Sequence, residues 1–307
     1  YIPDEAKIDN RYYFIRCRTR FYLKEGKLPF IQIKGNYLYP PTQHLATSDV
    51  YNKKTKQYES YYVDRNGNQL PATVELTLTM TDYEIIKEQY NLVDFEILSG
   101  MWFYTKIGLF DTYIDKYKQI KMNSKGAVRN IAKLFSNNLY GKFAASDNSS
   151  FKTAYIKDDL TLGLTIQEEY DKKPGYIPIG SAITSYARKH SFTVAQQNYY
   201  GSDKPGFIYC DTDSIHIDLP FDQIKGVKTH ETEYGAWKAE ASWDVGIFTR
   251  QKTYIEHVIA ENFAPVKDPY YNIKCAGMPD RCKELFKVSL GTPLKYSEAA
   301  KEYNEAE

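Results

Sequence analysis

The stretch that most restricts how this chain can fold is IYCDTDSIH, in which two aspartates one residue apart stand between apolar runs. A continuous strand would place Asp211 and Asp213 on one face, because strand side chains repeat with period 2. A tight hairpin would instead place both at its tip. Two unit charges about 4 Å apart repel by roughly 4 kcal/mol at an effective dielectric constant near 20. We therefore expect a compensating cation beside them.

The same letters also fit a plain turn. Asp, Thr and Ser side chains at a turn can hydrogen-bond to their own backbone. For an isolated Asp-x-Asp pair this is the default interpretation, and a second group of residues is needed before metal chemistry is favoured.

Composition narrows the class of protein without choosing one. At 307 residues the chain can hold two or three folding units. The sequence has no apolar run of the roughly 18 residues that a membrane helix needs, and no secretory-signal pattern is visible, so we expect an intracellular protein. The four cysteines include no C-x-x-C pair, which argues against a zinc site. The net charge of +1 implies that any basic surface is local.

Hydrophobic periodicity divides the chain into segments. Residues 11–39 are predicted to form two strands joined at KEGKLP, and residues 58–80 a second hairpin around DRNGN with one polar face. Thr81 and Glu84 form a capping-box pattern at the start of a short helix. Farther on, the pattern predicts a pair of antiparallel helices over 108–144, a protruding hairpin over 145–176, a helix over 177–200 and strands over 234–258 and 270–278.

The second helix of the predicted pair carries polar side chains on one face. Spacings of three to four residues place them together, and they are Arg129, Lys133, Asn137, Tyr140 and Gly141, with Lys121 in the connection before the helix. Much of the remaining helix surface is apolar, so we expect the helix to pack by that side, which is formed by Val128, Ile131, Leu134, Phe135 and Leu139.

The polar face has two interpretations. A solvated helix face would account for the arginine and lysine alone. Like charges four residues apart cost a few tenths of a kcal/mol, which a multiply charged anion such as a nucleotide triphosphate would offset. Gly141 beside the ring of Tyr140 favours the second interpretation, because a glycine admits close approach of a base pair.

Four motifs in order make the chain resemble family B DNA polymerases. KLFSNNLYG (133–141) and YCDTDS (209–214) resemble the fingers and palm motifs called B and C. RQKTYIE (250–256) is similar to the family's Lys-x-Tyr element, and ITSYAR (183–188) to its T-x-x-(G/A)-R element. The phrases GLFDTYIDKYKQIKM, LYGKFA and KCAGM look closer still to the protein-primed branch, of the phage phi-29 type. The resemblance runs over essentially the whole chain.

The resemblance implies an α+β fold of the right-hand polymerase type, with a palm of antiparallel sheet and helices, helical fingers, two inserted hairpin subdomains and a partial thumb. By position it implies a first inserted, priming-protein-region-like subdomain at 1–108, fingers at 109–144, a second inserted hairpin subdomain at 145–176, a palm at 177–275 and a partial thumb at 276–307.

The resemblance also implies nucleotidyl transfer by a two-metal mechanism, in which one ion activates the primer 3′-hydroxyl and the other holds the triphosphate. Asp213 would bind both Mg²⁺ ions, with Asp211 as the second catalytic carboxylate. Triphosphate contacts would come from Lys121, Arg129 and Lys133, and the base-pair pocket from Asn137, Tyr140 and Gly141. Primer or template contacts would come from Tyr209, Thr184, Arg188, Lys252 and Tyr254.

For single residues a plainer role competes. Tyr254 could be ordinary strand core, and Arg188 could pair with an acid. Because these residues occur together with motifs B and C, we favour function for all of them except Thr184.

One required motif is not found in this sequence. The family's motif A, D-x-x-S-L-Y-P, supplies another metal-bridging aspartate. KGNYLYP (34–40) ends in the same three letters, but Lys34 stands where the aspartate belongs, and a lysine does not bind Mg²⁺. We expect motif A and a proofreading exonuclease domain to lie before Tyr1, so that this chain is a fragment and binds Mg²⁺ weakly by itself.

The expected function is therefore DNA-templated DNA synthesis by part of a protein-primed replicative polymerase. The expected partners are primer-template DNA, a dNTP, a priming terminal protein and an upstream chain with motif A and the exonuclease, without a membrane. The expected location is the cytoplasm of a bacterial host, with a phage or mobile-element origin. The alternative is a catalytically inactive DNA- or nucleotide-binding remnant, or one chain of a split polymerase. A metal nuclease is a weaker third choice.

Overall fold

The structure is a computed structural model that describes residues 1–31, 74–145, 150–168, 175–230, 233, 235–250 and 252–277, together with the short strands β2 (Val50–Asn52), β3 (Gln57–Glu59), β4 (Tyr61–Val63) and β5 (Gln69–Pro71). The chain divides into two compact units, residues 1–204 and 205–307.

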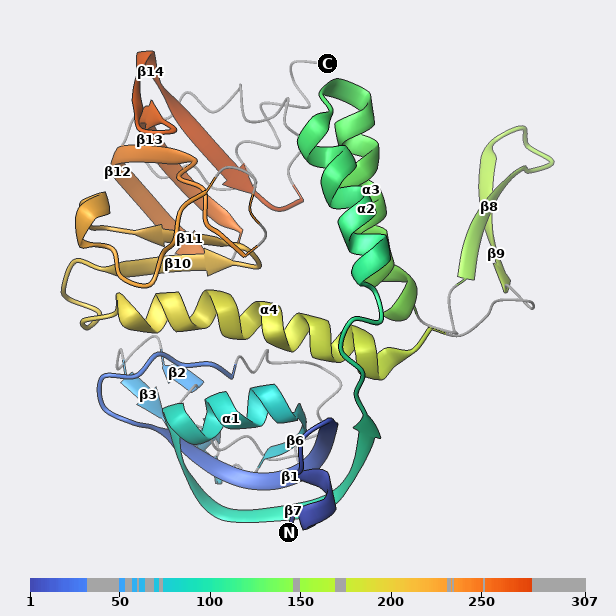
Figure 1. Ribbon diagram of the computed structural model, residues 1–307, viewed down its shortest axis with the longest axis vertical. Coiled ribbons are helices and arrows are strands. Elements are labelled where there is room, and N and C mark those ends of the chain that lie inside the picture. The colour runs from blue at the N-terminus through green and yellow to red at the C-terminus, as the bar shows by residue number, and fades with distance from the viewer. Residues whose placement is uncertain are drawn as a thin grey trace. The chain divides into compact units, whose positions relative to one another are not determined.

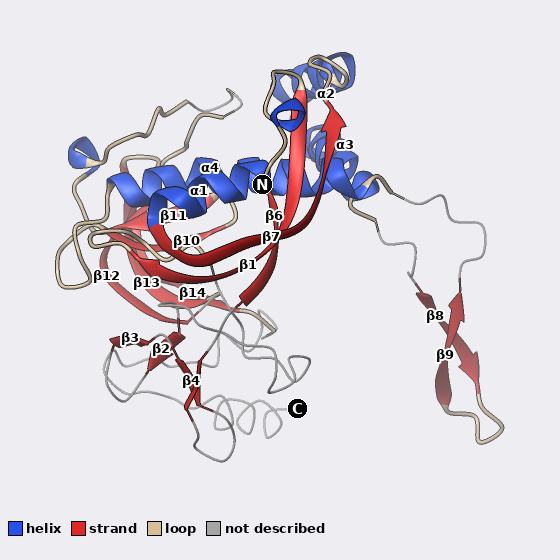
Figure 2. Ribbon diagram, turned by 90° about the horizontal axis from the view of Figure 1, so that it is seen from below, coloured by secondary structure: helices blue, strands red, loops and turns tan. Residues whose placement is uncertain are grey.

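The first unit is built on a three-stranded antiparallel sheet in the order β6-β1-β7. These strands are β1 (Arg11–Leu23), β6 (Val74–Thr79) and β7 (Tyr90–Tyr104), and they curve side by side in Figure 2. Alternate residues of β1 are buried from Tyr13 to Phe21, because successive strand side chains point to opposite faces. A short 3₁₀ helix, η1 (Asp4–Ala6), precedes the sheet.

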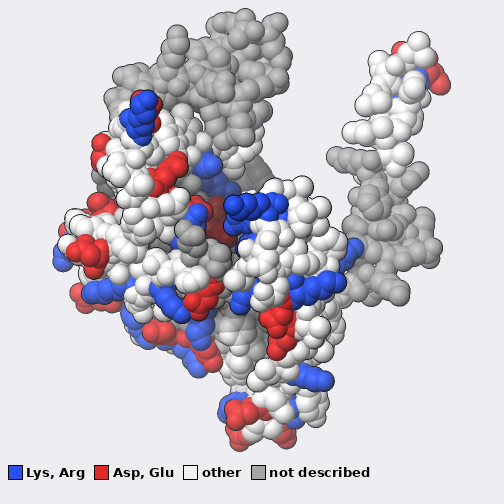
Figure 3. All heavy atoms as spheres, turned by 45° about the horizontal axis from the view of Figure 1, so that its top comes forward, with Lys and Arg blue, Asp and Glu red and all other residues white. Residues whose placement is uncertain are grey.

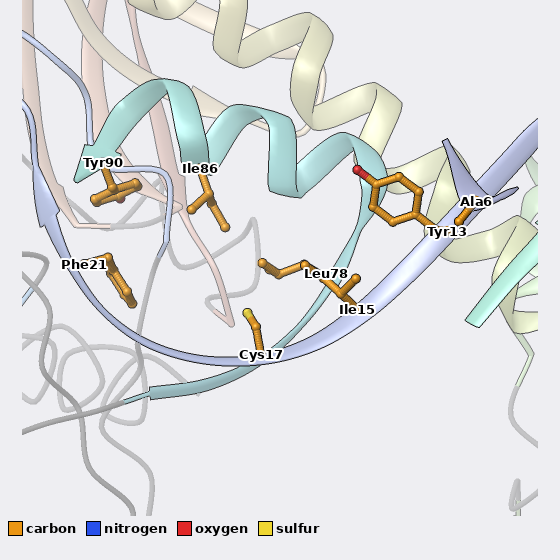
Figure 4. Close-up of a cluster of buried hydrophobic side chains, with 8 residues drawn as sticks. All are labelled: Ala6, Tyr13, Ile15, Cys17, Phe21, Leu78, Ile86 and Tyr90. Carbon is orange, nitrogen blue, oxygen red and sulfur yellow. The ribbon is translucent and has the colours of Figure 1, made fainter. Parts of the chain in front are cut away.

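Helix α1 (Met80–Gln89) covers the apolar face of this sheet. The core between them consists of Ala6, Tyr13, Ile15, Cys17, Phe21, Leu78, Ile86 and Tyr90 (Figure 4). The rings of Phe21 and Tyr90 meet edge to face, with centroids 5.1 Å apart. Burying one such side chain contributes about 1.5–3 kcal/mol, so this layer holds the sheet and α1 together. Burial also raises the pKa of the Cys17 thiol to about 11, which makes it unreactive at neutral pH.

The opposite face of β1 is polar. Arg16 and Arg18 both donate to the carboxylate of Glu75 on β6, at 2.6 and 2.5 Å. Arg20 pairs with Asp94 of β7. Such exposed ion pairs contribute about 0–1 kcal/mol each, so the apolar face supplies most of the stability of this sheet.

The first of the two strands predicted over residues 11–39 is confirmed as β1, and it pairs with β6 and β7. Of the second, only Phe30 and Ile31 are described after KEGKLP, and they form no strand; residues 32–39 lie outside the described residues. Tyr90 Oη instead accepts from the amides of Phe30 and Ile31, at 2.6 and 3.0 Å. The KGNYLYP stretch lies outside the described residues.

The predicted hairpin over 58–80 is confirmed only around its turn. β4 pairs with β5, whereas β6 pairs with β1. The predicted polar face of β6 is confirmed at Glu75 and Thr77, which are exposed, but Thr79 at the end of the same face is buried. The N-cap of α1 is Thr79 rather than Thr81, and its hydroxyl accepts from the Asp82 amide at 3.1 Å.

The predicted helices and the protruding hairpin are confirmed. α2 (Asp111–Asn123) and α3 (Gly126–Phe143) lie side by side in Figure 1, separated in sequence by Ser124 and Lys125. β8 (Ser150–Ile156) pairs with β9 (Leu162–Glu168), and α4 (Ile177–Gln197) follows.

The second unit contains a hairpin and a three-stranded antiparallel sheet. β10 (Phe207–Asp211) pairs with β11 (Ser214–Ile217), and η2 (Phe221–Gln223) follows. The sheet has the order β12-β13-β14, formed by β12 (Ala241–Arg250), β13 (Thr253–Glu261) and β14 (Ala264–Cys275), which confirms the predicted strands.

The chain is thus a mixture of helices and antiparallel sheets, as expected for the α+β class. Helix α4 contacts α1, α3 and β6 and belongs to the first unit. Among the described residues, no helix has the length and apolar character needed to span a membrane. Figure 3 shows basic and acidic side chains intermingled on the face that it draws, in keeping with the net charge of +1.

Candidate functional site

The two aspartates lie at the tip of the β10–β11 hairpin. Asp211 is in register with Ser214, so that Thr212 and Asp213 alone form the connection. Thr212 has φ of +55°, a left-handed conformation that is rare for a β-branched residue and found most often at functional or strained sites. The Thr212 hydroxyl donates to Asp211 Oδ1, and the Ser214 hydroxyl to Asp211 O, both at 3.1 Å. Local capping is therefore present, and Asp213 is exposed.

The cation beside Asp211 is Lys252. Its ammonium pairs with Asp211 Oδ2, and its backbone N–H donates to Tyr209 Oη at 2.9 Å. Lys252 lies between β12 and β13 with φ of +56°, so a second residue with left-handed backbone meets the hairpin tip. The hydrogen bond from Lys252 lowers the pKa of the Asp211 carboxyl, and the same bond raises the pKa of Lys252. The Lys252 side chain thus compensates the negative charge of Asp211, as expected from the sequence.

Replacing Lys252 with methionine is expected to raise the pKa of Asp211 toward its ordinary value, measured by carboxyl NMR titration. The lowered pKa of Asp211 stabilises the fold above about pH 4 and loses this effect as the pH falls through the folded value. The raised pKa of Lys252 stabilises the fold below about pH 10 and loses this effect as the pH rises through the folded value. The stability difference between the two proteins should therefore be flat from about pH 5 to 9. A difference that grows below pH 4 would contradict the ion pair.

Tyr254 belongs to an aromatic cluster beside the tip. Its ring stacks on Phe248 at 5.2 Å and lies 5.6 Å from the ring of Tyr209. Burial, and then the charge of Glu256, raise the pKa of Tyr254 to about 12. The phenol therefore stays protonated at neutral pH and can donate a hydrogen bond.

The tip fits part of a divalent-metal site. Carboxylate oxygens are the ligands that Mg²⁺ prefers, and it commonly keeps several waters beside one or two carboxylates. Asp211 and Asp213 offer such oxygens, although Lys252 already occupies Oδ2 of Asp211. Within the part of the chain that the structure describes, no third His, Cys, Asp or Glu joins them to make a group of three.

In the first unit, α3 presents the predicted polar face. Arg129, Lys133, Asn137, Tyr140 and Gly141 are all exposed on α3, and Lys121 lies in the last turn of α2. Over the described ranges, neither Arg129 nor Lys133 pairs with a carboxylate, so both cations are available to an anion.

The other side of α3 is not buried as predicted. Ala132 is its one buried residue in the described structure, while Val128, Ile131 and Leu134 are exposed by 53, 51 and 59%. Phe135 stacks on Tyr117 of α2, with centroids 5.0 Å apart. Contacts between two exposed helices cover only part of each apolar side, which explains the difference.

Gly141 has no packing reason to be glycine. A Cβ built on it would meet no atom within 4 Å, and it lies inside a helix, where glycine costs about 1 kcal/mol relative to alanine.

Gly141→Ala is therefore expected to raise the free energy of unfolding by about 0.5–1 kcal/mol and to raise the KM for dNTP. Urea unfolding and steady-state incorporation measure the two effects. Asn138→Ala, at an exposed position of the same helix, is the control. A more stable Gly141→Ala variant with unchanged KM would reject a pocket role.

On α4, local bonds occupy both predicted nucleic-acid contacts. The Thr184 hydroxyl donates to the backbone oxygens of Gly180 and Ser181, at 3.2 and 2.9 Å. Arg188 Nη2 donates to Asp82 Oδ2 of α1 at 2.7 Å. The plainer role for Arg188, pairing with an acid, is thus present in the structure.

The structure brings Tyr209, Asp211, Lys252 and Tyr254 together in the second unit. In the first unit it places the predicted nucleotide contacts on α3, with Lys121 in the last turn of α2. Sequence reasoning missed Asp82, and also the buried pair His216 and Glu256 behind Tyr254. The signal for Glu256 was its spacing, since a residue two positions after Tyr254 on a strand shares its face.

Comparisons with known proteins agree with these motifs. The sequence model of the family described as DNA polymerase type B, organellar and viral, matches residues 4–220. The DNA polymerase of Bacillus phage phi29 is 35% identical over 301 residues, covering 92% of this chain and 47% of the phage protein. That of Streptococcus phage Cp-1 is 32% identical over 283 residues, covering 92% and 45%.

The fold agrees as well. The solved structure of Phi29 DNA polymerase complexed with primer-template DNA and incoming nucleotide substrates matches with a TM-score of 0.71 and 34% identity, covering 93% of this chain and 46% of that one. The chain spans about half the length of these relatives. Because the family model matches most of its length, the chain belongs to the type B DNA polymerases of organelles and viruses.

Proposed function

We propose that this chain is the polymerase part of a protein-primed DNA polymerase, which transfers nucleotides from dNTPs to a primer hydroxyl on a DNA template. The observation that carries the proposal is the hairpin tip, where Asp211 and Asp213 lie beside Lys252 and the Tyr209–Tyr254 cluster in a member of this family. A solved relative is complexed with primer-template DNA and nucleotides, which supports the same partners here. A priming terminal protein and a segment with motif A and the exonuclease complete the proposed assembly, in the cytoplasm of a bacterial host.

The proposed subdomains keep the predicted names. Inserted hairpin subdomains at 1–108 and 145–176, fingers at 109–144, a palm at 177–275 and a partial thumb at 276–307 are part of the proposal. The exposed cations of α3 support the fingers, and the protruding β8–β9 hairpin supports the inserted subdomain at 145–176.

The roles of the tip residues follow from their contacts. Asp213 and Asp211 would hold Mg²⁺, which supplies activation of the primer hydroxyl and neutralises charge on the triphosphate. Lys252 compensates the charge of Asp211 and lowers its pKa. Tyr254, protonated at neutral pH, can donate a hydrogen bond to the primer end, and Tyr209 fixes the Lys252 backbone.

In the first unit, cations bind the nucleotide. Arg129 and Lys133 present positive charge on one helix face, which suits a triphosphate, and Lys121 lies in the neighbouring helix. Asn137, Tyr140 and Gly141 continue that face toward the end of α3 and would shape the base-pair pocket. Arg188 would contact a backbone phosphate beside its bond to Asp82, whereas Thr184 keeps the plainer role of bonding to its own helix.

A second function is a DNA-binding module without catalysis, which is favoured because the described residues contain no group of three possible metal ligands. Incubating the chain with Mg²⁺, dNTPs and a primed template separates the two. Extension of the primer, lost on chelation of Mg²⁺, is expected for the polymerase. Tight, salt-dependent retention of primed DNA without extension would favour the binding module, and no retention at any salt would reject both.

A further inference from the structure

A histidine–carboxylate pair lies behind the aromatic cluster of the second unit. His216 of β11 is in register with Tyr209, and its Nδ1 lies 2.6 Å from Oε1 of Glu256 on β13. The two side chains are only 12 and 4% exposed. Asn272 of β14 donates to the other carboxylate oxygen at 3.0 Å. Both oxygens of Glu256 therefore have a partner, which a buried carboxylate requires.

The ring of His216 contacts the residues that approach the tip. Its centroid lies 4.8 Å from that of Tyr254, 5.5 Å from that of Tyr209 and 5.1 Å from that of Phe248. Tyr209 in turn accepts the backbone N–H of Lys252, whose ammonium pairs with Asp211. A connected series thus runs from Glu256 through His216 and Tyr209 to Lys252 and Asp211.

We infer that His216 and Glu256 are positioning residues for the hairpin tip. The bond to Glu256 fixes the orientation of the imidazole, and the imidazole holds the rings of Tyr209 and Tyr254. The Tyr209 hydroxyl then fixes the strained Lys252 backbone, with φ of +56°, so that its ammonium stays on Asp211. The effect of this pair on primer binding rests on the proposed function, whereas its effect on Lys252 does not.

Two substitutions each remove one of the two interactions of His216. His216→Phe keeps a ring and removes the hydrogen bond to Glu256, while His216→Asn keeps a polar nitrogen near Nδ1 and removes the ring. In each variant of the whole chain, amide hydrogen exchange at Lys252 should rise by about fivefold, the change expected when one hydrogen bond is lost. The amide of Ile255, in the central strand of the same sheet, is the internal reference.

His257→Phe is the matched control. His257 lies next to Glu256 on β13, its Nδ1 lies 2.7 Å from Asp244 Oδ1, and its ring lies 4.8 Å from that of Tyr271. It has the same carboxylate–histidine–tyrosine arrangement, but strand alternation places it on the other face. Exchange at Lys252 should stay unchanged in this variant.

The outcomes decide the inference. Faster exchange at the Lys252 amide in His216→Phe and His216→Asn, with the Ile255 amide unaffected, supports positioning by His216. Equal acceleration of the Lys252 and Ile255 amides in these two variants would show general destabilisation and overturn the inference, as would unchanged exchange at Lys252. Retention of primed DNA is measured on the same proteins, and we expect His216→Phe to weaken it severalfold relative to His257→Phe. Failure of the unsubstituted chain to bind DNA would reject the proposed function, while the exchange result would still decide the inference.

Discussion

Replacing Asp213 with alanine is expected to lower nucleotide incorporation by at least roughly a thousandfold, because metal ions at such sites supply several kcal/mol of transition-state stabilisation. The reason for choosing Asp213 over its neighbour is the ion pair at the tip. Lys252 occupies an oxygen of Asp211, whereas in the described structure no lysine or arginine pairs with Asp213. Asp213 is thus the tip carboxylate most available to a cation. Primer extension at saturating dNTP and primed template measures the effect.

The control is Asp222→Ala. Asp222 is an exposed carboxylate in η2 of the same unit, and its removal changes net charge by the same amount. Both variants should unfold at the same urea concentration as the parent chain, since exposed substitutions usually change stability by less than about 0.5 kcal/mol. Incorporation that survives in Asp213→Ala would contradict the assignment of the tip as the metal site. Incorporation lost equally in Asp222→Ala would point to a general effect of charge.

Local sequence patterns predicted segments well and pairing partners poorly. The helical period over 108–144 and the strand patterns over 234–258 and 270–278 predicted the helices and strands found there, because the spacing of apolar residues reports which face is buried. Of the two partners of β1, β7 lies more than sixty residues away along the chain, and nothing within β1 specifies that choice. Phe30 and Ile31, at the start of the predicted second strand, form no strand, because Tyr90 from another part of the chain accepts their backbone hydrogens.

The site shows the same division. The carboxylates, Lys252 and Tyr254 were singled out from motifs and resemblance, and the structure adds that Lys252 is the cation on Asp211. The pair His216 and Glu256 escaped notice, because its partners come from three strands whose register no single motif contains.

Arg188 belongs to a sequence motif but has a structural role as well, because it pairs with Asp82. The second prediction concerns the stability that Asp82 contributes. The Asp82 side chain is 11% exposed, and its Oδ2 accepts from Arg188 Nη2 at 2.7 Å and from the Ser185 hydroxyl at 3.0 Å. Thr79 Oγ1, the N-cap of α1, donates to the same Ser185 hydroxyl at 2.9 Å. The network therefore joins the start of α1 to the middle of α4.

Asp82→Asn is expected to lower the free energy of unfolding by about 1.5–3 kcal/mol, the range for hydrogen bonds to a charged group. The urea midpoint should fall with little change of slope. Glu84→Gln is the matched control, because Glu84 pairs with Lys189 across the same two helices while both side chains are nearly half exposed. Such a pair contributes about 0–1 kcal/mol, so equal losses in the two variants would contradict a buried network.

The same variants decide the role of Arg188. If it acts only through Asp82, the losses of stability in Asp82→Asn and Arg188→Gln should not add in the double variant, because both remove one interaction. DNA retention at low salt should then change equally little in both single variants. A larger loss of DNA retention in Arg188→Gln would show that the guanidinium, which is about half exposed, contacts phosphate as well as Asp82. In that case the pair holds α4 in place and orients a DNA contact at the same time.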